Sequence, residues 1–183
     1  MTDRAPLDRP TLTTERLVLR RPAARDADAI VATVGDAEVA RRLSRVPHPY
    51  RPADAAFFLD EIVPFEWTWA ITQRGAITAK DSDTLIGSVG LTPGETADTA
   101  ELGYWLARPC WGRGLVTEAA RVVVGFGFNT LRLPAITSGY FANNPASGRV
   151  LEKLGFVETG RAMRPCLAQG REVPSVEMRL PAP

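Results

Sequence analysis

A strand-like run in the middle of the chain leads through a short glycine loop directly into a helix. The run is Glu101–Leu106, and the loop contains Gly112 and Gly114. Two glycines allow a backbone to approach a ligand closely and to turn its N–H groups outward. A helix start adds unpaired N–H donors and the positive end of the helix dipole. The segment therefore predicts a phosphate or pyrophosphate site, although the same pattern also forms a plain tight turn between a strand and a helix.

The residues after Gly114 exclude two common nucleotide-binding loops. Leu115, Val116 and Thr117 supply no third glycine of a dinucleotide fingerprint. They also lack the Gly-Lys-Ser/Thr ending of a nucleoside triphosphate loop. The glycine loop by itself therefore identifies no particular ligand.

The composition indicates one ordinary globular domain. The chain has 183 residues, of which 45% are apolar and 23% charged. Its 22 Lys and Arg nearly balance 21 Asp and Glu, so we expect neither nucleic acid nor a membrane as a partner. A polar N-terminus unlike a signal peptide, and no apolar run that could span a bilayer, predict a cytoplasmic protein. Residues 1–12 predict a flexible N-terminal tail, and residues 13–181 a single domain.

Cysteine and histidine usage argues against metal and histidine-based chemistry. Cys110 and Cys166 lie far apart and in no metal-ligand spacing, which is typical of two reduced thiols in a cytosolic protein. His48 is the one histidine, so a catalytic triad or a multi-histidine metal site would depend on it alone. We therefore expect no metal site.

Hydrophobic periodicity and breaking residues predict strands and helices in succession. Strands are expected at 14–20, 67–73, 84–91, 97–107, 134–141, 156–161 and 172–180. Helices are expected at 27–34, 37–43, 52–63, 114–128 and 145–154. Asp26, Asp36 and Asn144 stand where helix N-caps are expected, and Pro145 stands at the first helical position after Asn144.

Three pieces of sequence resemble one known family. They are Glu101-Leu-Gly-Tyr-Trp-Leu106, Trp111-Gly-Arg-Gly-Leu-Val-Thr-Glu-Ala119, and Asn144-Pro-Ala-Ser147 followed by Val150-Leu-Glu-Lys-Leu-Gly-Phe156. In this order and spacing they resemble the GNAT superfamily of acyl-CoA-dependent N-acyltransferases. The opening strand, Thr14-Glu-Arg-Leu-Val-Leu-Arg20, resembles the branch that includes ribosomal-protein N-terminal acetyltransferases, the Rim type. The similarity covers residues from about 12 to 181 and implies an α/β (α+β) fold: a mixed, mostly antiparallel sheet flanked by helices on both faces.

The resemblance implies acetyl-CoA as cofactor and coenzyme A as product. The family's pyrophosphate loop is usually Gln/Arg-x-x-Gly-x-Gly/Ala, and Pro109 departs from its first position by offering neither a side-chain donor nor an N–H. The departure is modest if backbone N–H groups hold the phosphates. Arg113 either adds charge to a phosphate or is a solvated loop arginine. The implied cofactor-binding residues of the loop are Trp111, Gly112, Arg113, Gly114, Leu115 and Val116.

The resemblance also implies that the strands at 101–107 and 134–141 splay apart. The unpaired backbone groups between them would hold the pantetheine arm of the cofactor as a missing strand. Asn144 matches the family asparagine that contacts this arm. An N-cap asparagine before Pro145 would explain the same residue structurally, and the two roles are compatible.

Ser147 occupies the serine position of the family motif and is our first choice as general acid. Acyl transfer expels a thiolate, and a thiol of pKa about 8.5 leaves more easily beside a proton donor. Tyr140, near the end of the preceding strand, is the other candidate, although an ordinary strand aromatic would also explain it.

Glu101 matches the glutamate that the family carries on the strand before the loop. An α-amine has a pKa near 7.7–8.0 and a lysine amine one near 10.4, so either must lose a proton before it attacks. A carboxylate can accept that proton through water, which makes Glu101 the candidate general base; an exposed strand-end charge is the structural alternative. Glu118 is explained by the helix dipole alone. Cys110 has no second histidine to activate it, so direct attack by the amine is favoured over an acyl-cysteine.

The resemblance implies transfer to a primary amine in a ternary complex. A protein N-terminal α-amine is the favoured acceptor, and a small amine such as an aminoglycoside comes next. The segments 48–50 and 60–67, with Trp69, would face the acceptor, although a solvated helix end and buried tryptophans also explain them. The family further suggests a homodimer. The alternative function is a non-catalytic domain that binds acyl-CoA as a sensor or scaffold.

Overall fold

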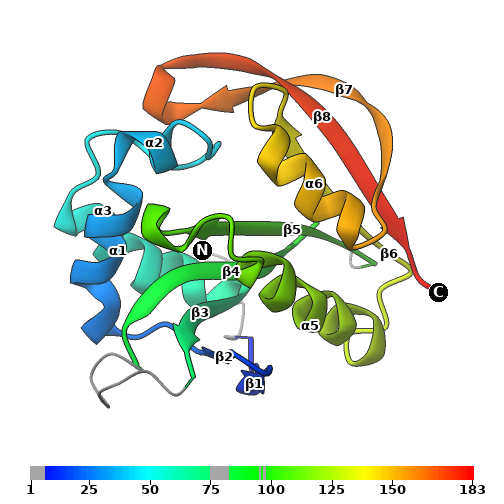
Figure 1. Cartoon of the computed structure of the whole chain (residues 1–183), viewed down its shortest axis with the longest axis horizontal. Coiled ribbons are helices and arrows are strands. Elements are labelled where there is room, and N and C mark those ends of the chain that lie inside the picture. The colour runs from blue at the N-terminus through cyan, green and yellow to red at the C-terminus, as the bar shows by residue number, and fades with distance from the viewer. Residues whose placement is uncertain (1–6, 75–82, 95, 97) are drawn as a thin grey trace.

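The computed structural model describes residues 7–74, 83–94, 96 and 98–183. An eight-stranded sheet in the order β1-β2-β3-β4-β5-β6-β8-β7 forms its centre (Figure 1). Neighbouring strands are antiparallel, with the exception of the parallel pair β5 and β6. The strands are β1 Leu12–Thr13, β2 Leu17–Arg20, β3 Trp67–Gln73, β4 Leu85–Pro93, β5 Thr99–Leu106, β6 Ala135–Phe141, β7 Val157–Cys166 and β8 Arg171–Pro181.

Helices cover both faces of this sheet. In Figure 1, α1, α2 and α3 gather on one side, and α5 and α6 lie on the other side of β4 and β5. The helices are α1 Ala27–Val34, α2 Ala37–Ala40, α3 Pro52–Phe57, α5 Leu115–Asn129 and α6 Pro145–Lys153. A π-helical segment, Phe58–Ile62, continues α3. The expected mixed, mostly antiparallel α/β architecture is confirmed. None of the helices in the described part of the chain is long and apolar enough to cross a membrane.

Alternation along β3 divides the core between the two faces. Trp69 and Ile71 belong to the larger cluster around α5, whereas Ala70 belongs to the cluster around α1 and α3. The period of two in a strand sends neighbouring side chains to opposite faces, so one strand supplies both clusters. The Trp69 ring meets Phe126 of α5 edge-on, with centroids 5.2 Å apart. The sheet is therefore fixed between two helical layers.

The strands β5 and β6 separate soon after they pair. Their parallel register extends only from Thr99 opposite Ala135 to Glu101 opposite Thr137. One side-chain bond closes the ladder: Ser138 Oγ donates to the carbonyl oxygen of Leu102 at 2.9 Å. Beyond that point β6 continues against β8 alone while β5 continues against β4. The expected splay is confirmed, and it leaves backbone groups of both strands facing a gap.

The N-terminal expectation is corrected for residues 7–12. Arg9 is buried, and its guanidinium donates to the carbonyl oxygens of Thr68 at 2.8 Å and Val63 at 2.5 Å. The carbonyl oxygen of Pro10 accepts a bond from the Trp69 indole at 2.8 Å. These residues are therefore packed onto the sheet and are not part of a flexible tail, because the buried Arg9 guanidinium is held by two backbone carbonyls of the domain. Residues 1–6 lie outside the described residues.

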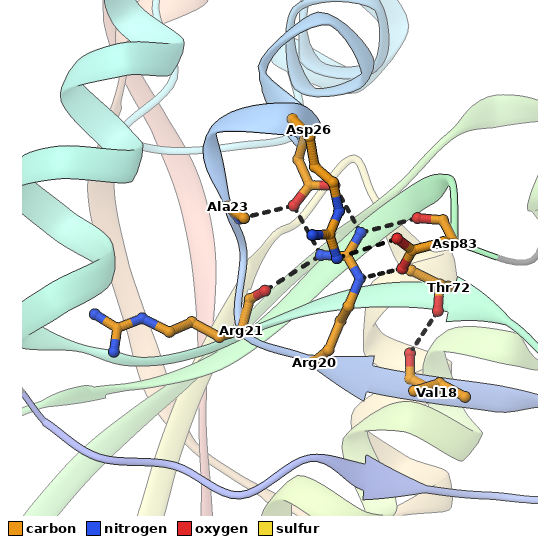
Figure 2. Close-up of polar contacts among 8 residues, drawn as sticks. Val18, Arg20, Arg21, Ala23, Asp26, Thr72 and Asp83 are labelled. Carbon is orange, nitrogen blue, oxygen red and sulfur yellow. Dashed lines mark hydrogen bonds and ion pairs between the residues drawn. The ribbon is translucent and has the colours of Figure 1, made fainter. Parts of the chain in front are cut away.

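Asp26 does not cap α1 with its side chain, contrary to the expectation. Figure 2 shows its carboxylate turned to Arg20, which donates to it through two nitrogens at 2.8 and 2.7 Å. The same guanidinium donates to Asp83 at 2.5 Å, and the Ala23 N–H donates to Asp26 at 2.8 Å. Hydrogen bonding to Asp26 is the main reason that the pKa of Arg20 is raised, against the opposing effect of burial. This aspartate at the start of a helix therefore forms a tertiary ion pair instead of an N-cap. The expected cap at Asp36 is present, since its side chain accepts from the Glu38 N–H.

Candidate functional site

A large cavity opens where β5 and β6 separate. Its volume is about 1170 Å³, above the ~300–1,000 Å³ of ordinary small-molecule sites, so it has room for two reactants. Its walls come from the glycine loop, the first turns of α6, the splayed strands and the segment between α2 and α3. The lining includes every predicted site residue apart from Arg113: Glu101, Trp111, Gly112, Gly114, Leu115, Val116, Tyr140, Asn144 and Ser147.

The glycine loop has a backbone conformation that favours glycine. Gly112 and Gly114 have φ of 73° and 74°, in the left-handed region where other residues are strained. A Cβ at Gly112 would meet nothing within 4 Å, and one at Gly114 only Arg16 at 3.7 Å. The glycines are therefore required for the turn rather than for lack of space. Gly114 is the N-cap residue of α5 and has no side chain to cap it, which leaves first-turn N–H groups facing the cavity.

Trp111 holds the loop against the end of β5. Its indole N–H donates to the carbonyl oxygen of Leu106 at 2.7 Å. The Arg42 guanidinium lies 5.2 Å from the centre of its ring, a cation–π distance. The residue is 39% exposed and lines the cavity. Cys110, beside it, is buried.

A polar cluster ties the first turn of α5 to the N-terminal strands. Glu118 accepts bonds from Thr14 Oγ1 at 2.6 Å and from Arg16 Nε at 2.7 Å. Burial works against ionisation of Glu118, but these hydrogen bonds outweigh it and lower the pKa of the carboxyl group. Arg16 also donates to the carbonyl oxygen of Arg113 at 3.0 Å. Glu118 is thus explained by more than the helix dipole, and Arg113, which does not line the cavity, is held by its backbone.

Asn144 begins α6 but does not cap it. The residue is at the N-cap position with Pro145 following, as predicted, yet its side chain makes no capping hydrogen bond. Its backbone carbonyl accepts from the Ser147 N–H at 3.1 Å, so the turn is closed by the main chain. The cap interpretation of its side chain is therefore wrong, and the amide lies at the cavity without that function.

Ser147 is hydrogen-bonded to Tyr104, which was not among the predicted site residues. The hydroxyl of Tyr104, from β5, lies 2.9 Å from Ser147 Oγ and 3.1 Å from the Ser147 carbonyl oxygen. Burial raises the pKa of Tyr104 to about 12, although the hydrogen bond to Ser147 works in the opposite direction. Tyr104 stands inside the family-like motif at 101–106, but no local pattern indicates that its side chain would reach α6.

Tyr140 is packed rather than hydrogen-bonded through its side chain. Its ring lies against Gly148, where an added Cβ would be only 2.7 Å from the ring carbon that carries the hydroxyl. No described residue makes a hydrogen bond to the Tyr140 hydroxyl, while its backbone carbonyl accepts from Ser175 Oγ at 3.1 Å. The structure therefore connects Ser147, and not Tyr140, to a polar partner.

Glu101 belongs to an ion-pair cluster that spans three strands. Arg164 of β7 contacts one carboxylate oxygen of Glu101 and both oxygens of Glu177 on β8, the Nε contact being 2.8 Å. Hydrogen bonding to Glu177 first, and to Glu101, raises the pKa of Arg164 against the effect of burial. A Cβ at Gly139 would lie 3.1 Å from the guanidinium carbon, so a glycine on β6 admits this arginine. Two carboxylates and one guanidinium leave the cluster with a net charge of −1.

Of the remaining residues that were expected to face the acceptor, some line the cavity and others do not. Glu66 and Tyr50 line the cavity, and Glu66 pairs with Arg45 at 3.1 Å. Asp60 and Glu61 are exposed and do not line it. Trp69 is fully buried in the core, as the alternative explanation held. Burial, followed by the charge of Asp54, raises the pKa of Tyr50 to about 12.

The tip of the β7–β8 hairpin reaches across to the segment after α2. Ser44 Oγ donates to the Pro165 carbonyl oxygen at 2.7 Å, and the Leu167 N–H donates to the Ser44 carbonyl oxygen at 3.1 Å. The Gln169 side chain donates to the carbonyl oxygen of Arg41 at 3.0 Å. Figure 1 shows this hairpin arching from α6 to α2. The part of the cavity lined by Ser44 and Arg164 is therefore bordered by the hairpin tip on this side.

Comparison with known proteins gives consistent results. The family model described as acetyltransferase (GNAT) domain matches residues 16–157. The chain is 31% identical over 158 residues to the uncharacterized N-acetyltransferase YoaA of Bacillus subtilis, covering 82% of this chain and 85% of that protein. The structure of ribosomal-protein-S5-alanine acetyltransferase from Vibrio fischeri matches with a TM-score of 0.78 and 20% identity, over 94% of this chain and 97% of that chain. Spermidine N-acetyltransferase from Vibrio cholerae, in complex with CoA and spermine, matches with a TM-score of 0.74 and 20% identity, over 92% and 96%.

Proposed function

Because the chain belongs to the acetyltransferase (GNAT) domain family, we propose that it transfers the acetyl group of acetyl-CoA to a primary amine by direct attack in a ternary complex. The observation that carries this proposal is the gap between β5 and β6. The gap has the glycine loop at one end, and Glu101 and Ser147 line the same cavity. A cofactor arm and an amine can therefore meet between a carboxylate and a hydroxyl.

The residues of the cavity fit the parts of coenzyme A. The pyrophosphate would be held by backbone N–H groups from Gly112 to Val116, where left-handed glycines and an uncapped helix start leave donors unpaired. The pantetheine arm would lie along the splayed strands, beside the uncommitted amide of Asn144. The bound cofactor supplies an activated acetyl thioester. The main-chain donors hold it in place and contribute fixed dipoles.

Glu101 is proposed to remove the proton of the amine. Its side chain is 42% exposed, so water can connect it to an acceptor. Arg164 contacts one of its oxygens, and no described residue donates a hydrogen bond to the other. The net charge of −1 shared by Glu101, Arg164 and Glu177 favours the approach of an ammonium group, which then gives up its proton through water.

Ser147 is proposed to assist departure of the thiolate. A hydroxyl is a weaker acid than a thiol, so its contribution is a hydrogen bond to the sulfur as negative charge develops there. Tyr140 remains the second candidate for this role, since it lines the same cavity.

A protein N-terminal α-amine is the proposed acceptor, in the manner of the Rim-type branch, with a small amine such as an aminoglycoside next. The relatives in structure include both kinds of enzyme by name, one for a ribosomal protein alanine and one for spermidine. An extended N-terminus could enter the cavity beside the hairpin tip and present its amine to the anionic cluster. A cytoplasmic homodimer is part of the same proposal.

The test is release of free coenzyme A from acetyl-CoA with a panel of amines. The panel contains a peptide with a free Ala or Ser N-terminus, the same peptide with an acetylated N-terminus, spermidine and an aminoglycoside. We expect turnover with the free peptide and none with the blocked one. Tight binding of acetyl-CoA without turnover on any amine would contradict an enzyme and favour a sensor. Turnover on spermidine or the aminoglycoside alone would contradict the N-terminal acceptor.

A variant tests the proposed base. Glu101→Gln should lower the rate by about 10²–10⁴-fold, the usual contribution of a positioned base, and should change its pH dependence. Glu158→Gln is the matched control, since Glu158 is an exposed glutamate of β7 that pairs with Arg161 and does not line the cavity. An unchanged rate and pH profile in Glu101→Gln would remove Glu101 from this role.

A further inference from the structure

Tyr104 connects the two sides of the gap beyond the end of the β5–β6 ladder. Its backbone belongs to β5, three residues after the last paired position, Glu101. Its ring packs against the core cluster that contains Leu102 and Leu106. The hydroxyl reaches the first turn of α6, where it lies 2.9 Å from Ser147 Oγ and 3.1 Å from the Ser147 carbonyl oxygen. Ser147 is therefore held from the opposite strand.

The hydroxyl groups of Tyr104 and Ser147 each carry one hydrogen. Which acceptor each hydrogen is donated to decides whether Ser147 can donate a hydrogen bond to a third group. If Ser147 donates to Tyr104, the serine hydrogen is occupied and the phenol donates to the Ser147 carbonyl. If Tyr104 donates to Ser147 Oγ, the serine hydrogen is free for another acceptor. Burial raises the pKa of Tyr104 to about 12, so the phenol keeps its hydrogen throughout the pH range of an assay and remains available as a donor.

We infer that Tyr104 is a positioning residue for Ser147: its phenol donates to Ser147 Oγ and directs the serine hydrogen toward the departing sulfur. This inference rests on the proposed role of Ser147 in acetyl transfer. In that step the C–N bond forms, the C–S bond breaks, and the sulfur leaves with the electron pair, while the nitrogen, already deprotonated once by Glu101 through water, gives its second proton to solvent. The hydrogen bond from Ser147 stabilises the negative charge on the sulfur. Donating this bond makes Ser147 Oγ more negative, and the hydrogen bond from Tyr104 stabilises that oxygen in turn. No proton leaves Tyr104.

The geometry also explains why Tyr140 does not position the Ser147 hydroxyl. Tyr140 lies against the backbone at Gly148, and the nearest atoms to an added Cβ there are its ring carbons and hydroxyl. Its hydroxyl has no hydrogen-bond partner among the described residues, whereas Tyr104 has two acceptors on one residue. One tyrosine thus supports α6 by packing and the other by polar contact.

The experiment is a double-mutant cycle on coenzyme A release, using Tyr104→Phe, Ser147→Ala and the double variant. Tyr104→Phe should lower kcat by about 3- to 10-fold, the effect of one neutral hydrogen bond, with KM for acetyl-CoA unchanged. In the Ser147→Ala background the same substitution should have no further effect, because its target is gone. Thr137→Val is the matched control. It removes a hydroxyl that bonds across the same two strands, to the Ala100 carbonyl at 3.3 Å, outside the cavity, and should leave kcat unchanged.

Each other outcome contradicts the inference in a recognisable way. Equal losses from Tyr104→Phe with and without Ser147 would assign Tyr104 a structural role, as would a rise in KM without a fall in kcat. A slow Ser147→Ala with a wild-type-like Tyr104→Phe would overturn the inference and leave the proposed function intact. A fully active Ser147→Ala would remove the residue through which Tyr104 acts. A wild-type protein without turnover on any amine would overturn the proposed function and this inference together.

Discussion

At the scale of single residues, the glycine loop depends on backbone conformation and not on space. Gly112 and Gly114 have positive φ, yet a Cβ at either position has no neighbour closer than 3.7 Å. A side chain introduced at either position would meet little steric contact, but its backbone would be strained by the left-handed conformation. The same loop is secured from outside by Trp111 and Arg16, whose donors reach the carbonyl oxygens of Leu106 and Arg113.

Gly114→Ala should lower the free energy of unfolding by about 1–2 kcal/mol and weaken coenzyme A binding. The strained alanine would relax by moving the N–H groups at the start of α5 away from the position proposed to bind phosphate. Urea unfolding and calorimetric titration with coenzyme A measure the two effects. Gly160→Ala is the control, because Gly160 has no positive φ and no neighbour within 4 Å. Unchanged affinity in Gly114→Ala would argue against phosphate binding at this loop.

At the scale of elements, two polar clusters attach the N-terminal strands to the rest of the fold. Glu118 joins the start of α5 to Thr14 and Arg16, between β1 and β2. Asp26 joins Arg20 of β2 to the beginning of α1, and Arg20 continues to Asp83 before β4 (Figure 2). Both clusters connect residues far apart in sequence. The position of α5, and with it the glycine loop, therefore depends on side chains as well as on the apolar core.

The Glu118 cluster predicts a pH effect on stability. The pKa of Glu118 is lowered in the folded protein, so the carboxylate stabilises the fold above its unfolded pKa of about 4.5, and that contribution is lost as pH falls through the folded value. Glu118→Gln should be less stable than wild type at pH 7, and the difference should shrink toward pH 3. Urea unfolding at a series of pH values measures it. Glu152→Gln, on the exposed side of α6, should follow the wild-type curve at every pH.

The Asp26 cluster predicts a large loss of stability when one partner is removed. The side chains of Asp26 and Arg20 are 3% and 12% exposed, so Asp26→Ala would leave a buried guanidinium without its main partner. We expect the free energy of unfolding to fall by about 3–5 kcal/mol in chemical denaturation. Asp28→Ala, at an exposed position in the first turn of α1, should cost less than about 1 kcal/mol. Similar losses in the free energy of unfolding of the two variants would show that the Asp26–Arg20 ion pair contributes no more to stability than an exposed aspartate.

At the scale of the whole molecule, the cavity is bordered by segments from the entire chain. The wall between α2 and α3 comes from the first third of the sequence, and the hairpin tip that contacts it comes from the last. The glycine loop and α6 complete the other side. A ligand in this cavity would contact several of these segments at once, so its binding should stabilise the complete fold rather than one element.

Coenzyme A should therefore raise the thermal midpoint of unfolding of the whole protein. At a concentration 100 times its Kd, the added stability is about 2.7 kcal/mol, which corresponds to roughly 5–10 °C for a domain of this size. Differential scanning calorimetry should show one transition that moves as a unit. At the same coenzyme A concentration the shift should be smaller in Gly114→Ala and unchanged in Gly160→Ala. A second transition that does not move with coenzyme A would contradict coupling across the cavity.

Most elements could be predicted from local sequence because their causes are local. The strand at 67–73 and the helix start at Pro145 agree with the structure. Errors arose where a tertiary contact replaced a local one: Asp26 pairs with Arg20 instead of capping α1, and residues 7–12 pack through Arg9 instead of forming a tail. A polar side chain takes the partner that the fold brings to it, and an isolated segment does not contain that partner.

The order of elements, the position of the glycine loop and the family to which the chain belongs could be read from the amino-acid sequence, since these depend on residues close together in the chain. The contacts that hold the proposed reactive groups became visible only in the folded molecule. Glu101 meets Arg164 across 63 positions, and Tyr104 meets Ser147 across 43. Such contacts depend on where β5 leaves β6 and on how α6 and β7 then cross the gap. The physical reason is that a hydrogen bond is selected by distances of about 3 Å, which only the packed sheet and helices establish.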